Sequence, residues 1–323
     1  MKRYGILCLC SMLLLFSCKD ERFDVPGKPT FKIKIHRFDQ AFQTEKSIKD
    51  SAFLDLYAND IMGVGHPDGK MYQDFYEVFH SDTDIIHLYD TCQLVFKNVK
   101  PIEKKLTWAF YRLRYFFPEI PLPKVYMHIS AYAESIISAP GILSASLDKY
   151  LGVDYPMYQT LFQPYQSQHM YPDKLVTDYM AGWIRSELTP EKMVKKDRLL
   201  DYLLYEGKMM YLLKIILPNE RMEHITAFTN DQLKWCRNNE KQMWNNLLQL
   251  HHLYSSDRLT IAKYIEDAPT TAFFPKDSPG RAITWVGYRI IDAYMENNPK
   301  VTLQGMIYDT DAQGILAASC YHP

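Results

Sequence analysis

Apolar side chains occupy most of the helical circumference over residues 199–217, the most apolar stretch after the N-terminal segment. A surface helix carries an apolar stripe on one side only, so this pattern predicts a buried central helix. Charged residues interrupt it, among them Glu206, Lys208 and Lys214. A carboxylate in an apolar interior needs a cationic partner, a metal or a raised pKa. Glu206 is therefore the residue that most needs an explanation.

The remaining pattern predicts an α+β fold that is predominantly helical. Alternation with period two predicts strands over 31–38 and 124–132, and a Pro-Gly turn before the apolar run 142–147 predicts a hairpin or two neighbouring strands. Residues 63–69 and 148–171 are predicted loops. Helices are predicted over 39–44, 47–61, 82–96, 100–118, 174–187, 190–218, 219–228, 230–254, 257–265, 281–297, 303–308 and 312–319. A small N-terminal sheet thus precedes a helical C-terminal half, in one domain over 31–323.

The first residues have the pattern of an export signal. Lys2 and Arg3 precede an apolar run over 6–16 that is too short to span a membrane. The run ends in Leu15-Phe16-Ser17-Cys18, which resembles the bacterial lipobox. We therefore expect a signal peptide over 1–17, a lipidated Cys18 and a tether over 18–30, and a stably anchored chain. A plain signal peptide or a core helix is the alternative.

The tripeptide after Cys18, Lys19-Asp20-Glu21, looks like the signal that sends Bacteroidetes lipoproteins to the outer face of the outer membrane. This predicts a lipid-anchored protein of the outer membrane, exposed at the cell surface. The alternative is a solvated, charged tether without a sorting role.

Charge and cysteine content narrow the classes of function. The formal charge is −1, and loss of Lys2 and Arg3 makes the mature value 35 − 38 = −3, so no basic footprint for nucleic acid exists. Beyond the signal segment and Cys18, the thiols are Cys92, Cys236 and Cys320. Their wide spacing predicts neither a disulfide framework nor a metal knuckle, although one pair could form in an oxidising compartment.

Metal chemistry would need ligands that this chain lacks. The His-Glu-x-x-His motif of zinc peptidases is absent, and so are the nucleophile-elbow and phosphate-loop motifs. However, Glu206-Gly-Lys-Met-Met-Tyr211 is similar to the Glu-Gly-x-x-x-Tyr pattern that supplies the third zinc ligand of gluzincins. The preceding helix would carry the two histidines and has other residues there: Thr177, Asp178, Met180 and Ala181. We therefore expect a zincin-like scaffold that binds no metal and no cofactor.

Three longer segments resemble the gliding-motility-associated lipoprotein B (GldB) family of Bacteroidetes. They begin at Asp148 (DKYLGVDYPMY), at Tyr205 (YEGKMMY) and at Pro279 (PGRAITWVGYRII), in the same order after a lipobox. The resemblance implies a cell-envelope lipoprotein whose partners belong to the gliding or type IX secretion machinery. It also implies a distant likeness to predicted zinc peptidases, from which this chain departs at the two histidines.

These patterns favour a non-catalytic lipoprotein with a binding or assembly role on a degenerate peptidase-like scaffold. The rival hypothesis is an unusual hydrolase that uses Glu206 and Asp178 with a tyrosine, Tyr205 or Tyr179. A third is a surface lipoprotein that binds glycans or nutrients through the Tyr-rich segment 148–171. Tyr211 is a further candidate for the degenerate site. In the simplest alternative Glu206 only pairs inside the core, and the possible partners are tyrosines and Lys174, Arg185, Arg281 and Arg289.

Overall fold

The computed structural model describes residues 21–44, 50–195 and 197–323. It contains a four-stranded sheet in the order β1-β2-β4-β3. β1 (Ile35–Arg37) runs parallel to β2 (Lys124–His128), and β2 runs parallel to β4 (Ile142–Ser146). β3 (Ile136–Ala139) pairs antiparallel with β4. The predicted hairpin is confirmed at Pro140-Gly141, where Gly141 has a φ of 73° that suits a residue without a side chain.

Helices before the sheet are α1 (Phe38–Thr44), α2 (Ser51–Leu56) with a π-helical turn (η2, Tyr57–Ile61), α3 (Lys70–Ser81), α4 (Thr83–Val95) and α5 (Lys100–Phe116). After the sheet come α6 (Pro156–Leu161), α7 (Pro164–Ser167), α8 (Leu175–Glu187), α9 (Pro190–Met193), α10 (Leu199–Ile216), α11 (Met222–Thr226), α12 (Asn230–Asn238), α13 (Glu240–Gln249), α14 (Arg258–Ile265), α15 (Ile283–Asn297), α16 (Leu303–Tyr308) and α17 (Ala312–Ser319). The predicted α+β class with a helical C-terminal half is confirmed.

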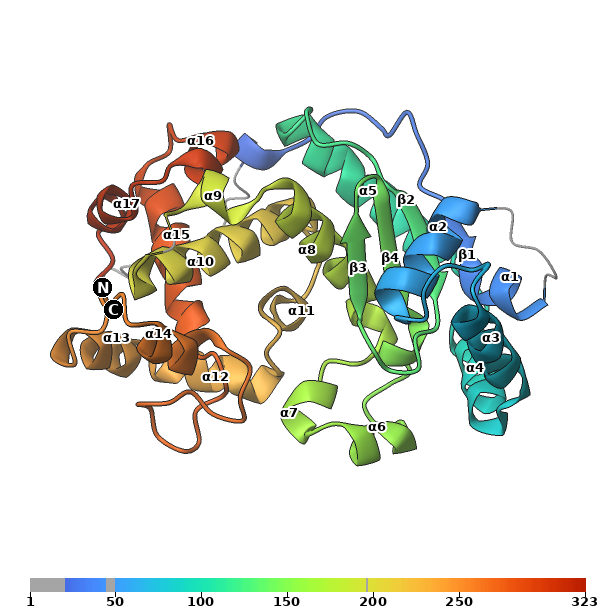
Figure 1. Ribbon diagram of the computed structural model, residues 1–323. Coiled ribbons are helices and arrows are strands. Elements are labelled where there is room, and N and C mark those ends of the chain that lie inside the picture. The colour runs from blue at the N-terminus through green and yellow to red at the C-terminus, as the bar shows by residue number, and fades with distance from the viewer. Residues whose placement is uncertain (1–20, 45–49, 196) are drawn as a thin grey trace, which may run out of the picture.

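Helix α8 joins the two halves of the molecule. It packs on β3 and β4 on one side and on α10 on the other, while α10 packs on α15 (Figure 1). α10 is buried over most of its length, as its apolar circumference predicts.

Two glycines let α10 and α15 cross closely. A Cβ on Gly207 would lie 2.3 Å from the Gly287 carbonyl oxygen, and one on Gly287 would lie 2.0 Å from that of Leu203. Both distances are far inside van der Waals contact, so only glycine fits at either position. The Gly of the Glu206-Gly207 pair therefore has a packing role that requires no metal.

Several predicted segments differ from the structure. The expected strand over 31–38 is reduced to β1, and Phe38 already begins α1. The sequence predicts no element where α3 lies, and the expected loop over 148–171 contains α6 and α7. The expected helix 190–218 breaks before α10, because the amides of Leu199 and Leu200 bond to the carbonyls of Ser255 and Leu253 instead of continuing a helix. The expected helix 230–254 divides into α12 and α13 at Asn239, whose side-chain amide donates to the Trp235 carbonyl oxygen at 2.9 Å.

Residues 21–34 form a segment that lies along α5, and we call it the strap. The side chain of Phe23 is buried edge-on against Phe116 and Tyr211, and Arg112 donates to the Phe23 carbonyl oxygen at 2.9 Å. Further along, the Tyr111 hydroxyl donates to the Pro26 carbonyl oxygen at 2.6 Å. Residues 21–30, expected as part of a tether, therefore pack on the domain because their apolar side chains and carbonyls find partners there.

Candidate functional site

Glu206 on α10 faces α8 and forms an ion pair there. Arg185, in the last turn of α8, donates to both carboxylate oxygens of Glu206 at 3.1 and 2.8 Å. A second guanidinium, that of Arg281, lies 3.6 Å from the same carboxylate. Two of the four cations expected as partners are therefore found beside Glu206. A third, Arg289, pairs instead with Glu240 and Asp292.

The second carboxylate, Asp178, is also neutralised. Lys174 lies one turn before Asp178 on the chain and forms an ion pair with one of its carboxylate oxygens. The Tyr150 hydroxyl donates to the other carboxylate oxygen at 2.9 Å. Burial raises the pKa of Tyr150 well above its usual value, and Asp178 adds to the effect. The phenol therefore stays protonated and acts as a hydrogen-bond donor.

A cavity of about 180 Å³ lies between α8 and α10. Thr177 and Ala181, which are one turn apart, line it together with Asp178 and Glu206. The hydroxyl of Thr177 is buried and has no hydrogen-bond partner among the residues that the structure describes. Met180 is buried outside this cavity. Of the four residues expected where a gluzincin has histidines, Thr177, Asp178 and Ala181 therefore line the cavity with Glu206, and Met180 does not.

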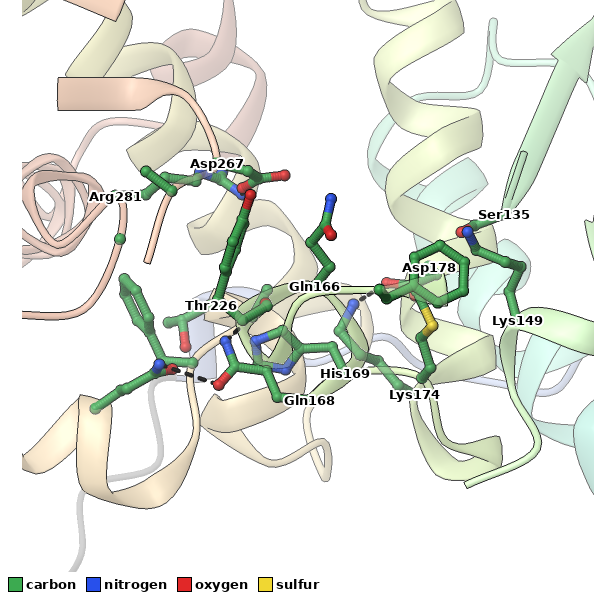
Figure 2. Close-up of a pocket in the computed structure, with 18 of the residues that line it drawn as sticks. Ser135, Lys149, Gln166, Gln168, His169, Lys174, Asp178, Thr226, Asp267 and Arg281 are labelled. Atoms are coloured by element: carbon green, nitrogen blue, oxygen red, sulfur yellow. Dashed lines mark hydrogen bonds and ion pairs between the residues drawn. The ribbon is translucent and has the colours of Figure 1, made fainter. Parts of the chain in front are cut away.

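A larger cavity of about 370 Å³ adjoins the first. The two share the lining residues Lys174, Asp178, Thr226, Ala227 and Arg281, so we treat them as one cleft. Figure 2 shows Lys149, Lys174 and Asp178 on one side of the larger cavity and Asp267 and Arg281 on the other. Amide and aromatic side chains complete the lining: Gln166, Gln168, Gln232, Tyr150, Tyr165, Phe162 and Phe228.

Local backbone structure places Arg281 at the cleft. A Cβ on Gly280 would lie 1.9 Å from the carbonyl oxygen of Ala268, so only glycine fits there. Arg281 itself has a φ of 57°, a left-handed conformation that is unfavourable for a side chain of its size. Its guanidinium contacts Asp267 at 3.2 Å as well as Glu206. Strained backbone of this kind clusters at functional sites.

The ionisable groups of the cleft are tuned by burial. Burial lowers the pKa of His169 to about 3, and the nearby charges of Lys174 and Arg281 act in the same direction. The imidazole is therefore neutral at physiological pH. Burial also lowers the pKa of Lys149, whose ammonium lies 4.2 Å from the centre of the Phe162 ring. The cleft thus offers neutral donors and acceptors beside charges that are already paired.

Asp148 organises the wall of the cleft from behind. It is fully buried and accepts hydrogen bonds from the backbone amides of Ser130 and Tyr132 and from the Ser146 hydroxyl. These bonds hold the turn after β2, where Tyr132 has a φ of 70°. Burial raises the pKa of Asp148, although the same donors oppose that shift. Asp148 thereby fixes the position from which Lys149 and Tyr150 reach the cleft.

The tyrosines predicted for the site separate in the structure. Tyr205 lies under Arg185, with the guanidinium carbon 5.4 Å from the ring centre. Tyr211 lies elsewhere, against Phe23 and Lys214. Tyr179 is buried and donates to the Tyr126 carbonyl oxygen on the sheet side of α8. Of these three, Tyr205 is the one that stays next to Glu206.

Other predicted residues lie outside the cleft. Cys18, Lys19 and Asp20 fall outside the described residues, and Glu21 begins a short 3-10 helix (η1, Glu21–Phe23). Cys92 and Cys236 are buried, Cys320 is exposed, and all three are free thiols. Within residues 21–44, 50–195 and 197–323, no three His, Cys, Asp or Glu residues form a group that could hold a metal ion. In the same part of the chain no helix has both the length and the apolar character to cross a bilayer.

Sequence reasoning missed several residues of the cleft. His169, Gln166 and Gln168 come from a segment that was expected as loop, while Thr226 and Gln232 come from the ends of α11 and α12. The signals that pointed to the cleft were the Tyr-rich composition of 148–171 and the Pro279-Gly280-Arg281 sequence.

The three segments that carry the family resemblance meet at this cleft. Lys149 and Tyr150 come from the first, Glu206 from the second, and Gly280 and Arg281 from the third. No curated protein and no solved structure matches the chain. Among known protein families, the one described as Gliding motility protein GldB matches residues 20–323. The chain therefore belongs to the GldB family of gliding-motility lipoproteins.

Proposed function

We propose that this protein is a lipid-anchored envelope component of the gliding-associated type, and that its cleft binds a partner molecule without catalysing its conversion. One observation carries the proposal: both carboxylates of the cleft, Glu206 and Asp178, are already neutralised by Arg185 and Lys174. A bidentate guanidinium occupies the oxygens that a metal ion or a transferred proton would need. The same pairing disfavours the rival hydrolase.

The scaffold itself supports descent from a gluzincin. Thr177, Asp178 and Ala181 stand in the spacing of His-Glu-x-x-His and line one cavity with Glu206. Two histidines one turn apart on α8, with a carboxylate from α10, would make a three-ligand zinc site. In this chain a hydroxyl and a methyl group replace the imidazoles, and Arg185 supplies the positive charge.

Metal analysis of the purified lipoprotein after growth with zinc tests the non-catalytic proposal. We expect no stoichiometric zinc in the native chain. Near-stoichiometric zinc would contradict the proposal, and so would peptide or glycan hydrolysis that is lost in a folded Glu206→Gln variant. The descent is tested separately with the variant Thr177→His/Ala181→His/Arg185→Ala, which should bind one zinc per chain. Its control, Thr177→His/Arg185→Ala, has one ligand fewer and should bind zinc far more weakly.

The lining of the larger cavity favours a glycan as the bound partner. Tyr150, Phe162 and Tyr165 offer aromatic surfaces, and Gln166, Gln168 and Gln232 offer amide donors and acceptors beside them. Binding to a glycan array, abolished by Tyr165→Ala and retained by the distant exposed Tyr115→Ala, would support this choice. If no glycan on the array binds and peptides of a library bind the same cleft, the partner would be a protein and not a glycan.

We propose a location on the outer membrane and at the cell surface, which is supported by Cys18 and by Lys19-Asp20-Glu21. Protease treatment of intact cells tests this location. Degradation of the chain is expected, and full protection would assign it to the periplasmic face.

For the gliding role, the native chain and the variants Arg281→Gln and Lys276→Gln would be tested for restoring colony spreading in cells that lack the gene. We expect that Arg281→Gln, the variant in the cleft, fails to restore spreading and that Lys276→Gln restores it. Equal restoration by both variants would show that the cleft has no part in motility.

A further inference from the structure

The strap fixes the point at which the chain leaves the folded domain. Phe23 is buried beside Arg112 and Phe116 on α5, and only residues 19–22 separate it from Cys18. Five steps of fully extended chain span at most about 18 Å. A lipid on Cys18 would therefore hold this part of the surface within about 18 Å of the bilayer.

The same part of the surface is basic and carries an exposed tryptophan. Trp108 on α5 is 41% exposed and lies one turn, about 6 Å, before Arg112. Among the described side chains of the strap and α5, Asp24 is the one acidic residue that is exposed. We define the basic-aromatic face as Trp108 together with the exposed lysines of the strap and α5, namely Lys28, Lys32, Lys34, Lys100, Lys104 and Lys105.

This concentration of positive charge contrasts with the whole chain, whose formal charge is −1. Two shallow grooves flank Trp108. One, of about 630 Å³, is lined by Lys104, Lys105, Arg112 and the end of α10, with Glu220 as its acidic residue. The other, of about 400 Å³, is lined by lysines of the strap and α5, with Glu103 as its acidic residue. Trp108 and Lys104 line both grooves, so the indole forms the ridge between them.

We propose that the basic-aromatic face docks on the anionic phospholipid headgroups of the leaflet that holds the lipid of Cys18. The proposal rests on the lipid anchoring proposed above. Tryptophan prefers the boundary between headgroups and acyl chains, while lysines extend their ammonium groups to phosphates. Each lysine near an anionic surface strengthens binding about fivefold at low ionic strength. The short link and the charge therefore act on the same face.

Docking on this face leaves the cleft accessible. In Figure 1 the strap crosses the top of the molecule, whereas α6, α7 and α12, which lie around the larger cavity, are at the bottom. A domain that rests on the strap and α5 therefore presents the cleft to the space beyond the membrane.

Depth-dependent quenching of tryptophan fluorescence tests the docking. The full lipoprotein is reconstituted into phosphatidylglycerol vesicles that carry a nitroxide near the headgroup. We expect part of the tryptophan fluorescence to be quenched in the native chain and this quenched part to be absent from Trp108→Phe. The comparison assigns the quenching to one of the five tryptophans. The variant Lys100→Gln/Lys104→Gln/Lys105→Gln should lower the ratio of docked to undocked protein about a hundredfold. Lys234→Gln/Lys241→Gln/Lys276→Gln, with three exposed lysines on other elements, is the matched control and should change nothing.

The outcomes separate docking from anchoring. Protein that stays on vesicles through a high-salt wash but shows no Trp108 quenching is anchored and overturns the docking. Equal effects of the two lysine variants, or Trp108 shielding by a second copy without lipid, also overturn it. Protein released by salt but quenched at low salt contradicts the lipid anchor and supports docking. Protein that never binds the vesicles refutes both.

Discussion

The ion pair between Glu206 and Arg185 matters more for the chemistry of the cleft than for the stability of the fold. The side chain of Arg185 is 39% exposed and that of Glu206 17%, so water screens the pair and its net contribution to folding is small. The sequence could name the four possible cations but could not choose among them. That choice depends on how α8 and α15 pack against α10, which is a tertiary property.

Lys208 has the opposite character, because it is fully buried on α10. Its ammonium donates to the carbonyl oxygens of Met193, at 2.8 Å, Ile307, at 3.2 Å, and Asp309. Burial lowers its pKa to about 8, which still leaves it protonated at neutral pH. Lys208→Met would leave three carbonyls without a donor and should reduce the free energy of unfolding by about 3 kcal/mol or more. Urea denaturation measures this, with the exposed Lys241→Met as control; equal stability of both variants would contradict it.

His128 predicts a dependence of stability on pH. It is fully buried at the end of β2, and burial lowers its pKa to about 3. The unfolded chain, with a histidine pKa near 6.5, therefore binds more protons between pH 6.5 and 3, and stability falls as the pH falls through that window. Within this window the free energy of unfolding changes with pH, and His128→Gln should reduce that change by about 1.4 kcal/mol per pH unit. Urea denaturation of the native chain and the variant between pH 6 and 4 checks it, and equal pH dependence of the two would contradict it.

At the scale of elements, the crossing of α10 and α15 sets the geometry of the cleft. Gly207 and Gly287 bring the two backbones together, and this approach places the segment before α15, with Arg281, beside Glu206. Gly287→Ala would force a Cβ against the Leu203 carbonyl and should cost at least about 3 kcal/mol of stability. Thermal unfolding measures the loss. Gly305→Ala, on α16, meets side-chain atoms alone, the Thr302 hydroxyl oxygen at 3.1 Å and a Val301 methyl at 3.8 Å, and should be much closer in stability to the native chain.

The accuracy of the predicted elements followed the strength of local signals. Helices α16 and α17 lie at their predicted bounds, and the side chains of Thr302 and Asp311 cap them by accepting from backbone amides. Helix α3 was missed because its N-cap is Gly69, which offers no side-chain oxygen, and a Gly- and Pro-containing loop precedes it. The cleft was largely missed because its walls come from short helices and turns without periodicity.

At the scale of the whole molecule, the short link between Cys18 and Phe23 would restrict how the domain sits on a membrane that holds the proposed lipid of Cys18. Insertion of a flexible Gly-Ser segment after Asp20 should leave the chain in the membrane fraction but lower the effective concentration of the basic-aromatic face at the surface. Trp108 quenching should then fall as the insert lengthens. An insert of equal length in the exposed loop at Ser256 is the control, and equal quenching in both would show that the link length is unimportant.

Because the strap lies opposite the larger cavity, docking through the strap would also set the height of the cleft above the membrane. A globular domain of this length is about 50 Å across, so the cleft opens several tens of ångströms above the headgroups. If the anchoring and docking proposed above hold, lipids of the anchoring leaflet would not reach the cleft. A molecule bound there would have to project across that gap or be carried to it, and the protein would act as a receptor at a fixed distance from its own membrane.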